Sequence, residues 1–263
     1  MHAESRRRLM RIFALGVILA AVGALVPALA AEPPEAAAPG PVASTWMMWP
    51  KPGEAQAFED GLKAHAAWRK AAGEGWSWRI YQPVIGEDLT FYVVRSDGHQ
   101  WADLDADVAW EKESHFFEKW MEQAGAHIAR YQHTVSVADF AHSKWQDSSD
   151  YRYFGVSSLF LRPGGWLDML DGLDKIHKAL VEKKWPMSYS IEWSMGGESP
   201  ILFIVPFRSY AEMAEPEPPM MKLLEEAMGS KEAAVAALKQ FEGSFDKESY
   251  TVYLYRDDLS TPK

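Results

Sequence analysis

The chain has 263 residues, of which 48% are hydrophobic and 13% aromatic, and this composition excludes disorder over most of its length. Its formal net charge of −10 falls to −13 without residues 1–30, which carry four Arg and one Glu, so we expect no nucleic-acid partner. The absence of cysteine excludes disulfides, thiolate metal sites, Fe–S clusters and covalently attached haem.

Residues 1–30 have the pattern of an export signal. Four arginines lie within residues 6–11, an apolar run follows at 12–25, and the small-residue sequence Ala-Leu-Ala at 28–30 is typical of a cleavage site. Residues 5–11 also resemble the twin-arginine export pattern, and an ordinary secretory signal is the alternative. An uncleaved anchor is a further alternative, but Pro27 and the cleavage pattern favour removal. We therefore expect a periplasmic or secreted protein that has no membrane partner after cleavage.

Residues 31–43 are rich in Pro and Ala and predict a flexible linker. The folded part is expected to begin near residue 44. From there the chain divides into a first repeat at 44–141, a linker at 142–153 and a second repeat at 154–263.

The two repeats become visible when the sequence is shifted by 111 positions. Residues 52–94 then align without a gap to 163–205 and share ten identities in 43 pairs, where composition alone gives roughly two or three. The identical pairs include the Pro-Gly turns at 52–53 and 163–164 and the Asp-Gly-Leu sequences at 60–62 and 171–173. One supersecondary unit therefore occurs twice.

Each repeat shows the same order of predicted elements. In the first, residues 45–50 predict a strand, 54–72 a helix, 76–84 and 89–95 a hairpin, about 105–131 a long helix capped by Asp105 or Asp107, and 135–141 a strand. In the second, the strands are expected at 155–161, 187–195, 201–207 and 250–256. Its helices are expected at 166–183 and at 216–241, the latter interrupted near Gly229.

This order, βαββαβ, is that of a ferredoxin-like unit, and the predicted fold class is α+β. Two such units in one chain resemble the dimeric α+β barrel superfamily in fused form. That superfamily includes antibiotic-biosynthesis-type monooxygenases, haem-degrading oxygenases and chlorite dismutase-like proteins. The resemblance covers about residues 45–257 and rests on element order and duplication. It implies two facing sheets with helices outside, and an intramolecular pseudo-dimer in a monomeric chain.

Strand alternation sorts the side chains of the second strand in each repeat. Trp78 and Ile80 are expected to pack under helices, whereas Arg79 and Tyr81 lie on the opposite face. Glu192 lies on that opposite face in the second repeat. If the sheets face each other, Arg79 and Glu192 approach across the pseudo-twofold axis. They form either a polar floor for a ligand or a structural ion pair.

Tryptophan is concentrated in the first repeat and its linker, which hold nine of the 12 Trp residues. A pocket lined with such side chains suits a small apolar or aromatic ligand, and core filling is the alternative. We therefore take the following residues as candidate ligand-binding residues: Trp49, His65, Trp78, Arg79, Tyr81 and Glu192.

One histidine lies on the first helix of each repeat. His65 takes the place of Ile176 on the buried stripe, and His177 lies one position further along in the second repeat. Each is either a core histidine or an axial ligand of haem. No Gly-rich phosphate loop, serine-hydrolase elbow or helical zinc pair occurs in the sequence.

These patterns leave three functions open. The first is binding of a small ligand in the Trp-rich first repeat without a cofactor, with oxygenase-like chemistry as its catalytic form. The second is a haem oxidoreductase, and the third is a non-catalytic envelope protein. Fold alone does not separate them, because this architecture supports unrelated chemistries.

Overall fold

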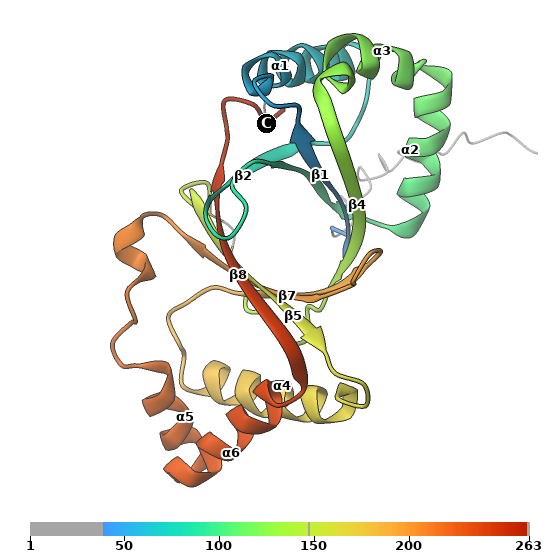
Figure 1. The fold of residues 1–263 in the computed structure, drawn as a ribbon. Coiled ribbons are helices and arrows are strands. Elements are labelled where there is room, and N and C mark those ends of the chain that lie inside the picture. Colours follow the sequence, from blue (N-terminus) through green and yellow to red (C-terminus); the bar gives the residue numbers. More distant parts are fainter. Residues whose placement is uncertain (1–38, 147, 262–263) are drawn as a thin grey trace, which may run out of the picture. The chain divides into compact units, whose positions relative to one another are not determined.

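Two repeats of the order βαββαβ close into one eight-stranded barrel, as Figure 1 shows. The structure, a computed structural model, describes residues 39–146 and 148–261. The expected export signal at 1–30 and residues 31–38 of the expected linker lie outside the described residues. The predicted α+β class with a tandem ferredoxin-like repeat is confirmed.

The first repeat contains β1 (Val42–Pro50), α1 (Ala55–Ala71), β2 (Arg79–Ile85), β3 (Tyr92–His99), α2 (Trp101–Glu113), α3 (Phe116–Gln123) and β4 (Ile128–Ala138). The second contains β5 (Tyr153–Leu161), α4 (Trp166–Glu182), β6 (Ser190–Met195), β7 (Ile201–Phe207), α5 (Met220–Met228), α6 (Lys231–Glu242) and β8 (Phe245–Tyr255). Short 3-10 helices at Gly125–His127 and Tyr210–Met213 precede β4 and α5.

The barrel closes because each repeat pairs its outer strands with the other repeat. A four-stranded sheet alone would leave two edges of unpaired backbone groups. Here β2 pairs with β8 and β4 with β6, so that the order around the barrel is β1-β3-β2-β8-β5-β7-β6-β4. Since all neighbours are antiparallel, β1 and β5 run in the same direction, and rotation about the barrel axis relates the two repeats.

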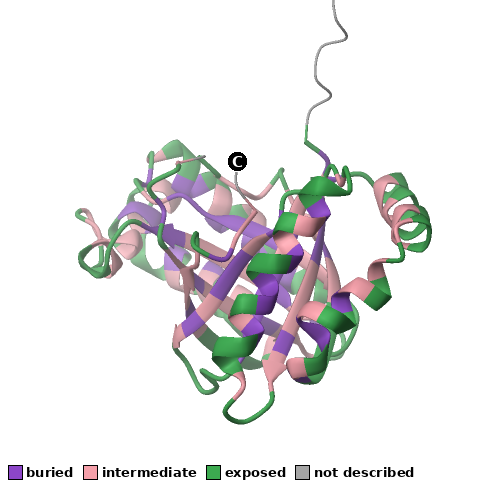
Figure 2. Ribbon diagram, turned by 90° about the horizontal axis from the view of Figure 1, so that it is seen from above, coloured by how far each residue is buried: buried purple, intermediate pink, exposed green. Residues whose placement is uncertain are grey.

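Alternate side chains of each strand point outward to the helices or inward to the barrel. Trp78 and Ile80 point outward and pack with Phe58 and Leu62 of α1, as the alternation predicts. Inward-facing aromatic side chains pack across the junction of the repeats, so Tyr81 meets Phe154 and Tyr255, and Phe91 meets Tyr253. Figure 2 shows the resulting pattern, with buried residues along the strands and exposed residues on the outer faces of the helices.

A glycine shared by the repeats lets the helices approach each other closely. A Cβ on Gly61 of α1 would lie 2.1 Å from the carbonyl oxygen of Gln123, and one on Gly172 of α4 would lie 2.9 Å from the backbone nitrogen of Phe241. Neither position has room for a larger residue. The close approach at Gly61 brings the end of α3 against α1.

The second helical region of the first repeat differs from its prediction. The expected helix at about 105–131 is two helices, α2 and α3, which are separated at Ser114 and at His115, where φ is 56°. Asp105 and Asp107 do not cap it, because the helix begins earlier with Gln100 as its N-cap and Asp103 in a capping box. The predicted helix also extends too far, because Tyr131 belongs to β4. This apolar residue fits both helical spacing and the alternation of a strand. The interruption predicted at Gly229 is present, between α5 and α6.

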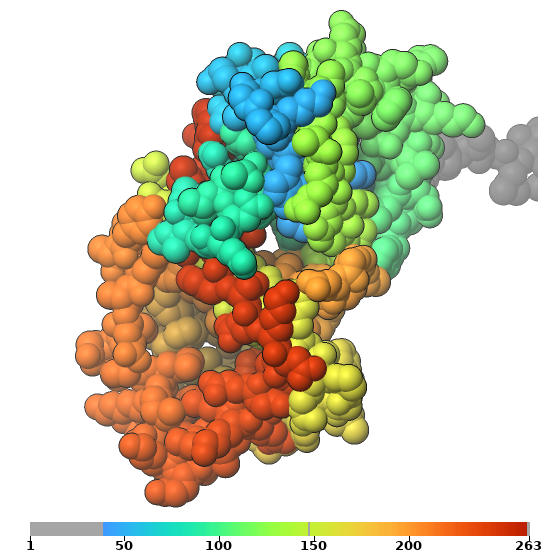
Figure 3. Space-filling view, viewed as in Figure 1, coloured from blue at the N-terminus to red at the C-terminus, as the bar shows by residue number. Residues whose placement is uncertain are grey.

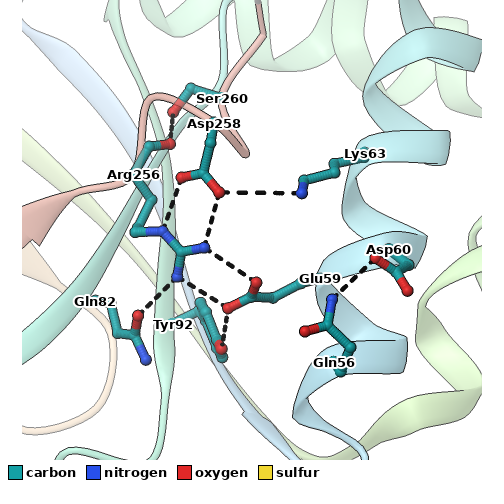
Figure 4. A network of polar contacts seen from close by, with 9 residues as sticks. All are labelled: Gln56, Glu59, Asp60, Lys63, Gln82, Tyr92, Arg256, Asp258 and Ser260. Carbon is teal, nitrogen blue, oxygen red and sulfur yellow. Dashed lines mark hydrogen bonds and ion pairs between the residues drawn. The ribbon is translucent and has the colours of Figure 1, made fainter.

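The chain after β8 folds back over the first repeat. Leu259 is 1% exposed and packs in the core beneath α1. As Figure 4 shows, the Arg256 guanidinium donates to both carboxylate oxygens of Glu59 at 2.9 and 3.0 Å and to both of Asp258 at 2.8 Å. The bonds from Arg256 hold the pKa of Glu59 below its usual value. Residues of the second repeat thus complete the core of the first.

We predict that Leu259→Ala lowers the free energy of unfolding by about 2–5 kcal/mol, because it leaves a cavity in that core. Urea denaturation followed by tryptophan fluorescence measures the change. Leu167→Ala is the matched control, since Leu167 is 75% exposed, and its effect should stay within about 0.5 kcal/mol. Equal effects of the two variants would contradict the role of Leu259.

Candidate functional site

The candidate site lies between the outer face of the first-repeat sheet and its helices. It is centred on His65, which sits on the buried stripe of α1 with Phe58, Leu62 and Arg69. Three aromatic rings surround its imidazole, with centroids 5.2 Å away for Trp68, 5.2 Å for Phe116 and 4.9 Å for Trp120.

One nitrogen of His65 is paired and the other is not. Nδ1 lies 2.9 Å from the amide oxygen of Gln123, which can only accept a hydrogen bond, so Nδ1 carries the proton. Nε2 then has a free lone pair, and it is buried without a hydrogen-bond partner among the described residues. Buried polar atoms are rarely left unpaired, which makes Nε2 the strongest indication of a ligand in this region.

The surroundings keep His65 neutral. Burial lowers the pKa of His65 to about 4, the bond to Gln123 opposes that shift, and the positive charge of Arg69 adds to it. A neutral imidazole with a protonated Nδ1 presents Nε2 as an acceptor. The site can therefore accept a hydrogen bond from a ligand hydroxyl or amide over the physiological pH range.

A charged cluster lies next to His65. The Arg69 guanidinium donates to both oxygens of Glu74 and has Asp107 at 3.8 Å. It also lies over aromatic rings, 4.9 Å from the centroid of Trp78, 5.2 Å from Trp110 and 4.7 Å from Phe116. Glu74 in turn accepts from the indole nitrogen of Trp78 at 3.0 Å.

Two further acids of the cluster are perturbed. Burial raises the pKa of Asp107 to about 6, although Arg69 opposes the shift. Burial, followed by the charge of Asp107, also raises the pKa of Glu111. A carboxyl group with a pKa near neutral pH, such as that of Asp107, is typical of sites that transfer protons, and structural clusters show such shifts too.

The second repeat shows that the fold does not require these polar groups. At the 111-residue offset, His65, Arg69 and Glu74 correspond to Ile176, Leu180 and Trp185. Those three residues are all buried in the apolar core beneath α4 and α5, where the indole nitrogen of Trp185 is also buried without a hydrogen-bond partner among the described residues. The sequence reasoning noticed His65 but missed Arg69 and Glu74, and the same offset would have revealed them.

Helix α2 covers this cluster loosely. It has no buried residue, and it reaches the cluster through Asp107, Trp110 and Glu111. In Figure 1 it stands to the side of the layer formed by α1 and α3. Left-handed backbone at His115 separates it from α3. These features make α2 the least firmly packed element of the site.

The other sequence candidates lie inside the barrel. Tyr81 and Trp49 belong to the inward aromatic cluster, so of the six candidates only His65 and Trp78 are in the helix-side site. The expected approach of Arg79 to Glu192 is wrong. Arg79 pairs with Asp97, and Arg95 of β3 forms the ion pair with Glu192 at 2.7 Å.

Strand order explains the exchange of partners. Arg79 and Arg95 are paired in register and both point inward, but β3 lies one strand nearer to β6 than β2 does. Small side chains beneath Arg95 let it cross the barrel, and it bonds Thr45 at 3.2 Å and Ser136 at 3.4 Å on the way. Ser136 also donates to Glu192 at 2.6 Å. The pair is buried and joins the two repeats.

The side chains around His65 do not fit a haem. An iron ligand needs open space in front of its nitrogen, but protein atoms bury Nε2 and three aromatic rings surround the imidazole. At His177, Nδ1 lies 3.0 Å from the Tyr189 hydroxyl and the ring of His142 is 5.7 Å away. A hydrogen bond at Nδ1 is compatible with metal binding through Nε2, so a haem at His177 stays a prediction.

The described part of the chain offers few other sites. No group of three or more acidic or histidine side chains in it is arranged to hold a metal ion. No helix in the same residues is both long and apolar enough to cross a membrane. A groove of about 490 Å³ lies in the second repeat between α4, α5 and α6. Alanines such as Ala233 and Ala237 line it together with Lys175, Lys178, Glu182 and Gln240, and Lys175 donates to Gln240 at 3.1 Å.

No protein-family model and no curated protein sequence matches the chain. Among solved structures, an anthrone oxidase-like protein is similar over 84% of this chain and 94% of its own, with 13% identity and a TM-score of 0.49. Chlorite dismutase from Candidatus Nitrospira defluvii, in complex with imidazole, is similar over 84% and 94%, with 10% identity and a TM-score of 0.49. No function is inferred from these likenesses, and the fold assignment rests on the strand pairing of this chain.

We predict that His65→Ile, which installs the second-repeat residue, removes a pH dependence of stability. The lowered pKa means that the unfolded chain binds a proton to His65 between about pH 6.5 and 4 while the folded chain does not, so wild type loses stability as pH falls. Between about pH 7.5 and 4.5 this loss is roughly 2–3 kcal/mol relative to the variant. Parallel curves of unfolding free energy against pH would contradict it.

Proposed function

We propose that the first repeat binds a small, uncharged aromatic molecule that carries a hydrogen-bond donor, such as a phenol. The observation that supports this proposal is the unpaired Nε2 of His65 inside an aromatic cage. An unsatisfied buried acceptor costs about 1–3 kcal/mol, and a ligand hydroxyl that donates to it recovers that cost. The repeat offset supports a functional origin, since isoleucine fills the same place in the second repeat.

The surrounding groups select the ligand's charge and shape. The rings of Trp68, Phe116 and Trp120 favour a flat apolar body. The acids Glu74 and Asp107 disfavour an organic anion, and Arg69 disfavours a cation. A neutral aromatic alcohol satisfies all three conditions.

Entry requires a rearrangement of the cover, because His65 is 4% exposed. Helix α2 is the element with the weakest attachment, as it buries none of its own residues. Outward movement of α2 would take Trp110 and Asp107 away from Arg69 and open the space in front of Trp68. Binding is then coupled to the position of α2.

An oxygenase-like reaction at the same site is the second candidate, and Asp107 is the observation that favours it. His65, with its lowered pKa, is a weak base, whereas a carboxyl group with a pKa of about 6 can take a proton near neutral pH. The phenol would give its O–H proton to Asp107, and a ring carbon would give an electron pair to O2, so that a carbon–oxygen bond forms and the phenolic C–O becomes a carbonyl. The proton then passes from Asp107 to the outer peroxide oxygen, and the product is a hydroperoxycyclohexadienone.

Calorimetric titration of the full chain with 4-methylphenol tests the binding proposal. We expect wild type to bind it, and toluene, which lacks the donor, to bind about tenfold more weakly or less. His65→Ile should abolish the preference for 4-methylphenol. His177→Ala is the matched control in the second repeat and should keep it. An unchanged preference in His65→Ile would overturn the proposed function.

Oxygen consumption during the same titration tests the catalytic form. Uptake of O2 that disappears in Asp107→Asn, while 4-methylphenol still binds, would support the oxygenase-like reaction. Binding without uptake would leave a ligand-binding protein.

We also propose that the protein is exported, on the strength of the arginine, apolar and Ala-Leu-Ala pattern in residues 1–30. Intact-mass analysis of the protein from a periplasmic or secreted fraction tests it. The expected mature chain begins at Ala31, and full-length protein confined to the cytoplasm would contradict export.

A further inference from the structure

The interior of the barrel is a second place where the structure can hold a ligand. Met47, Val156, Leu202 and Ile204 point inward, as their register and the alternation of the strands require, yet all four are only half-buried. Inward side chains of a closed barrel stay accessible only if the interior is hollow. Figure 3, which looks along the barrel, shows a narrow opening between the two repeats.

One mouth of this hollow has a pair of matching cation–aromatic contacts. The Arg130 guanidinium lies 3.5 Å from the ring centroid of Trp49, and the Lys247 ammonium lies 4.6 Å from that of Phe160. The two pairs are structurally equivalent. Trp49 and Arg130 are register partners on β1 and β4, and Phe160 and Lys247 are register partners on β5 and β8.

Both pairs lie at the same end of the barrel. Trp49 and Phe160 are one residue from the last residues of β1 and β5, and these two strands run in the same direction. Rotation about the barrel axis therefore places Arg130 and Lys247 on opposite sides of one mouth. Few residues are identical between the repeats. A cation stacked on an aromatic ring occurs in both, and this agreement supports a function for the pairs at this mouth.

The two cations have no close ion pair. No carboxylate of the described residues lies within ion-pair distance of Arg130, and Lys247 has a loose contact to Glu198 at 3.7 Å. Asp88 lies at the same mouth, where it accepts a hydrogen bond from the indole of Trp49 at 2.8 Å; its bonds to Thr90 and Trp49 and, in smaller part, the charge of Arg130 lower its pKa. The side chains of Arg130 and Lys247 are exposed. They form a positive rim on a protein whose formal charge is −10, which is the arrangement that attracts an anion to one particular place.

The walls below this rim combine apolar side chains with small or polar ones, since Gln132, Ser158 and Ser249 also point inward by register. Met47, Val156, Leu202 and Ile204 form the apolar part. Beyond them, at the other end of the barrel, Arg95 and Glu192 span the interior with Ser136 and Thr45. These polar groups form hydrogen bonds or ion pairs with one another, so none of them is left to bind a charged ligand group. The charge of a ligand would therefore lie at the mouth.

We propose that the barrel interior binds an amphipathic organic anion, a carboxylate with an apolar tail. The carboxylate lies between Arg130 and Lys247 at the mouth, and the tail lies along Met47, Val156 and Ile204. This site is separate from the helix-side site around His65, which disfavours anions. An eight-stranded barrel is either filled by its own side chains or holds one small ligand, and the half-buried inward side chains favour the second arrangement here.

Calorimetric titration with decanoate tests the proposal, with decan-1-ol as the uncharged analogue and acetate as the anion without a tail. Decanoate should bind the full chain, and the other two should bind at least about tenfold more weakly. The double variant Arg130→Gln/Lys247→Gln should lose about tenfold or more in decanoate affinity. Lys112→Gln/Lys231→Gln removes two exposed cations elsewhere and should leave the affinity unchanged.

NMR of isoleucine methyl groups reports where the tail lies. The Ile204 methyl resonances should shift on decanoate binding, whereas those of Ile191, which faces outward beneath α4, should not. Equal affinity in both double variants would overturn the proposal, as would shifts at Ile191 alone. Tight binding of acetate would indicate a simple anion site and would also overturn it. His65→Ile should still bind decanoate, so the test is independent of the function proposed for that site.

Discussion

The pairing of β2 with β8 and of β4 with β6 is the constraint on which the rest of the structure depends. These two junctions leave no free sheet edge and fix both repeats around one axis. They also separate the outer faces, which the helices cover, from an interior shared by the repeats. The buried Arg95–Glu192 pair lies beside one junction and ties β3 of the first repeat to β6 of the second. A buried pair of this kind adds specificity of pairing more than stability.

Because the chain contains the same unit twice, equivalent positions of the two repeats can be compared. Where the repeats agree, as at Gly61 and Gly172, the shared residue meets a need of the fold. Where one repeat has a polar residue at a buried position and the other has an apolar one, the fold does not require the polar residue. Its presence then needs a separate explanation. His65, Arg69 and Glu74 stand where the other repeat has an ordinary apolar core, and this difference is the basis of the proposed function. The mouth of the barrel is the complementary case, because Arg130 and Lys247 are retained at equivalent exposed places.

Much of the fold could be predicted from the sequence, because the internal repeat and the strand alternation are local patterns. The division of α2 from α3 could not, since it depends on one left-handed residue, His115, in a stretch of helical periodicity. The site was predicted less completely. His65 and Trp78 were identified from composition and spacing, but the partner of Glu192 depends on strand order around the barrel, which pairs it with Arg95 instead of Arg79. Tyr81 faces the interior as the alternation of the strand predicts, and Trp49 of β1 faces it as well.

The central claim is that His65 presents a neutral, unpaired Nε2 to a ligand. Nitrogen-15 NMR of the histidine side chains of the full chain, assigned with His65→Ile, tests it most directly. The account predicts a protonated Nδ1 and an unprotonated Nε2 at neutral pH, no titration until the pH approaches about 4, and a shift of the Nε2 resonance when 4-methylphenol is added. A proton on Nε2, or a pKa near the ordinary value of about 6.5, would contradict it.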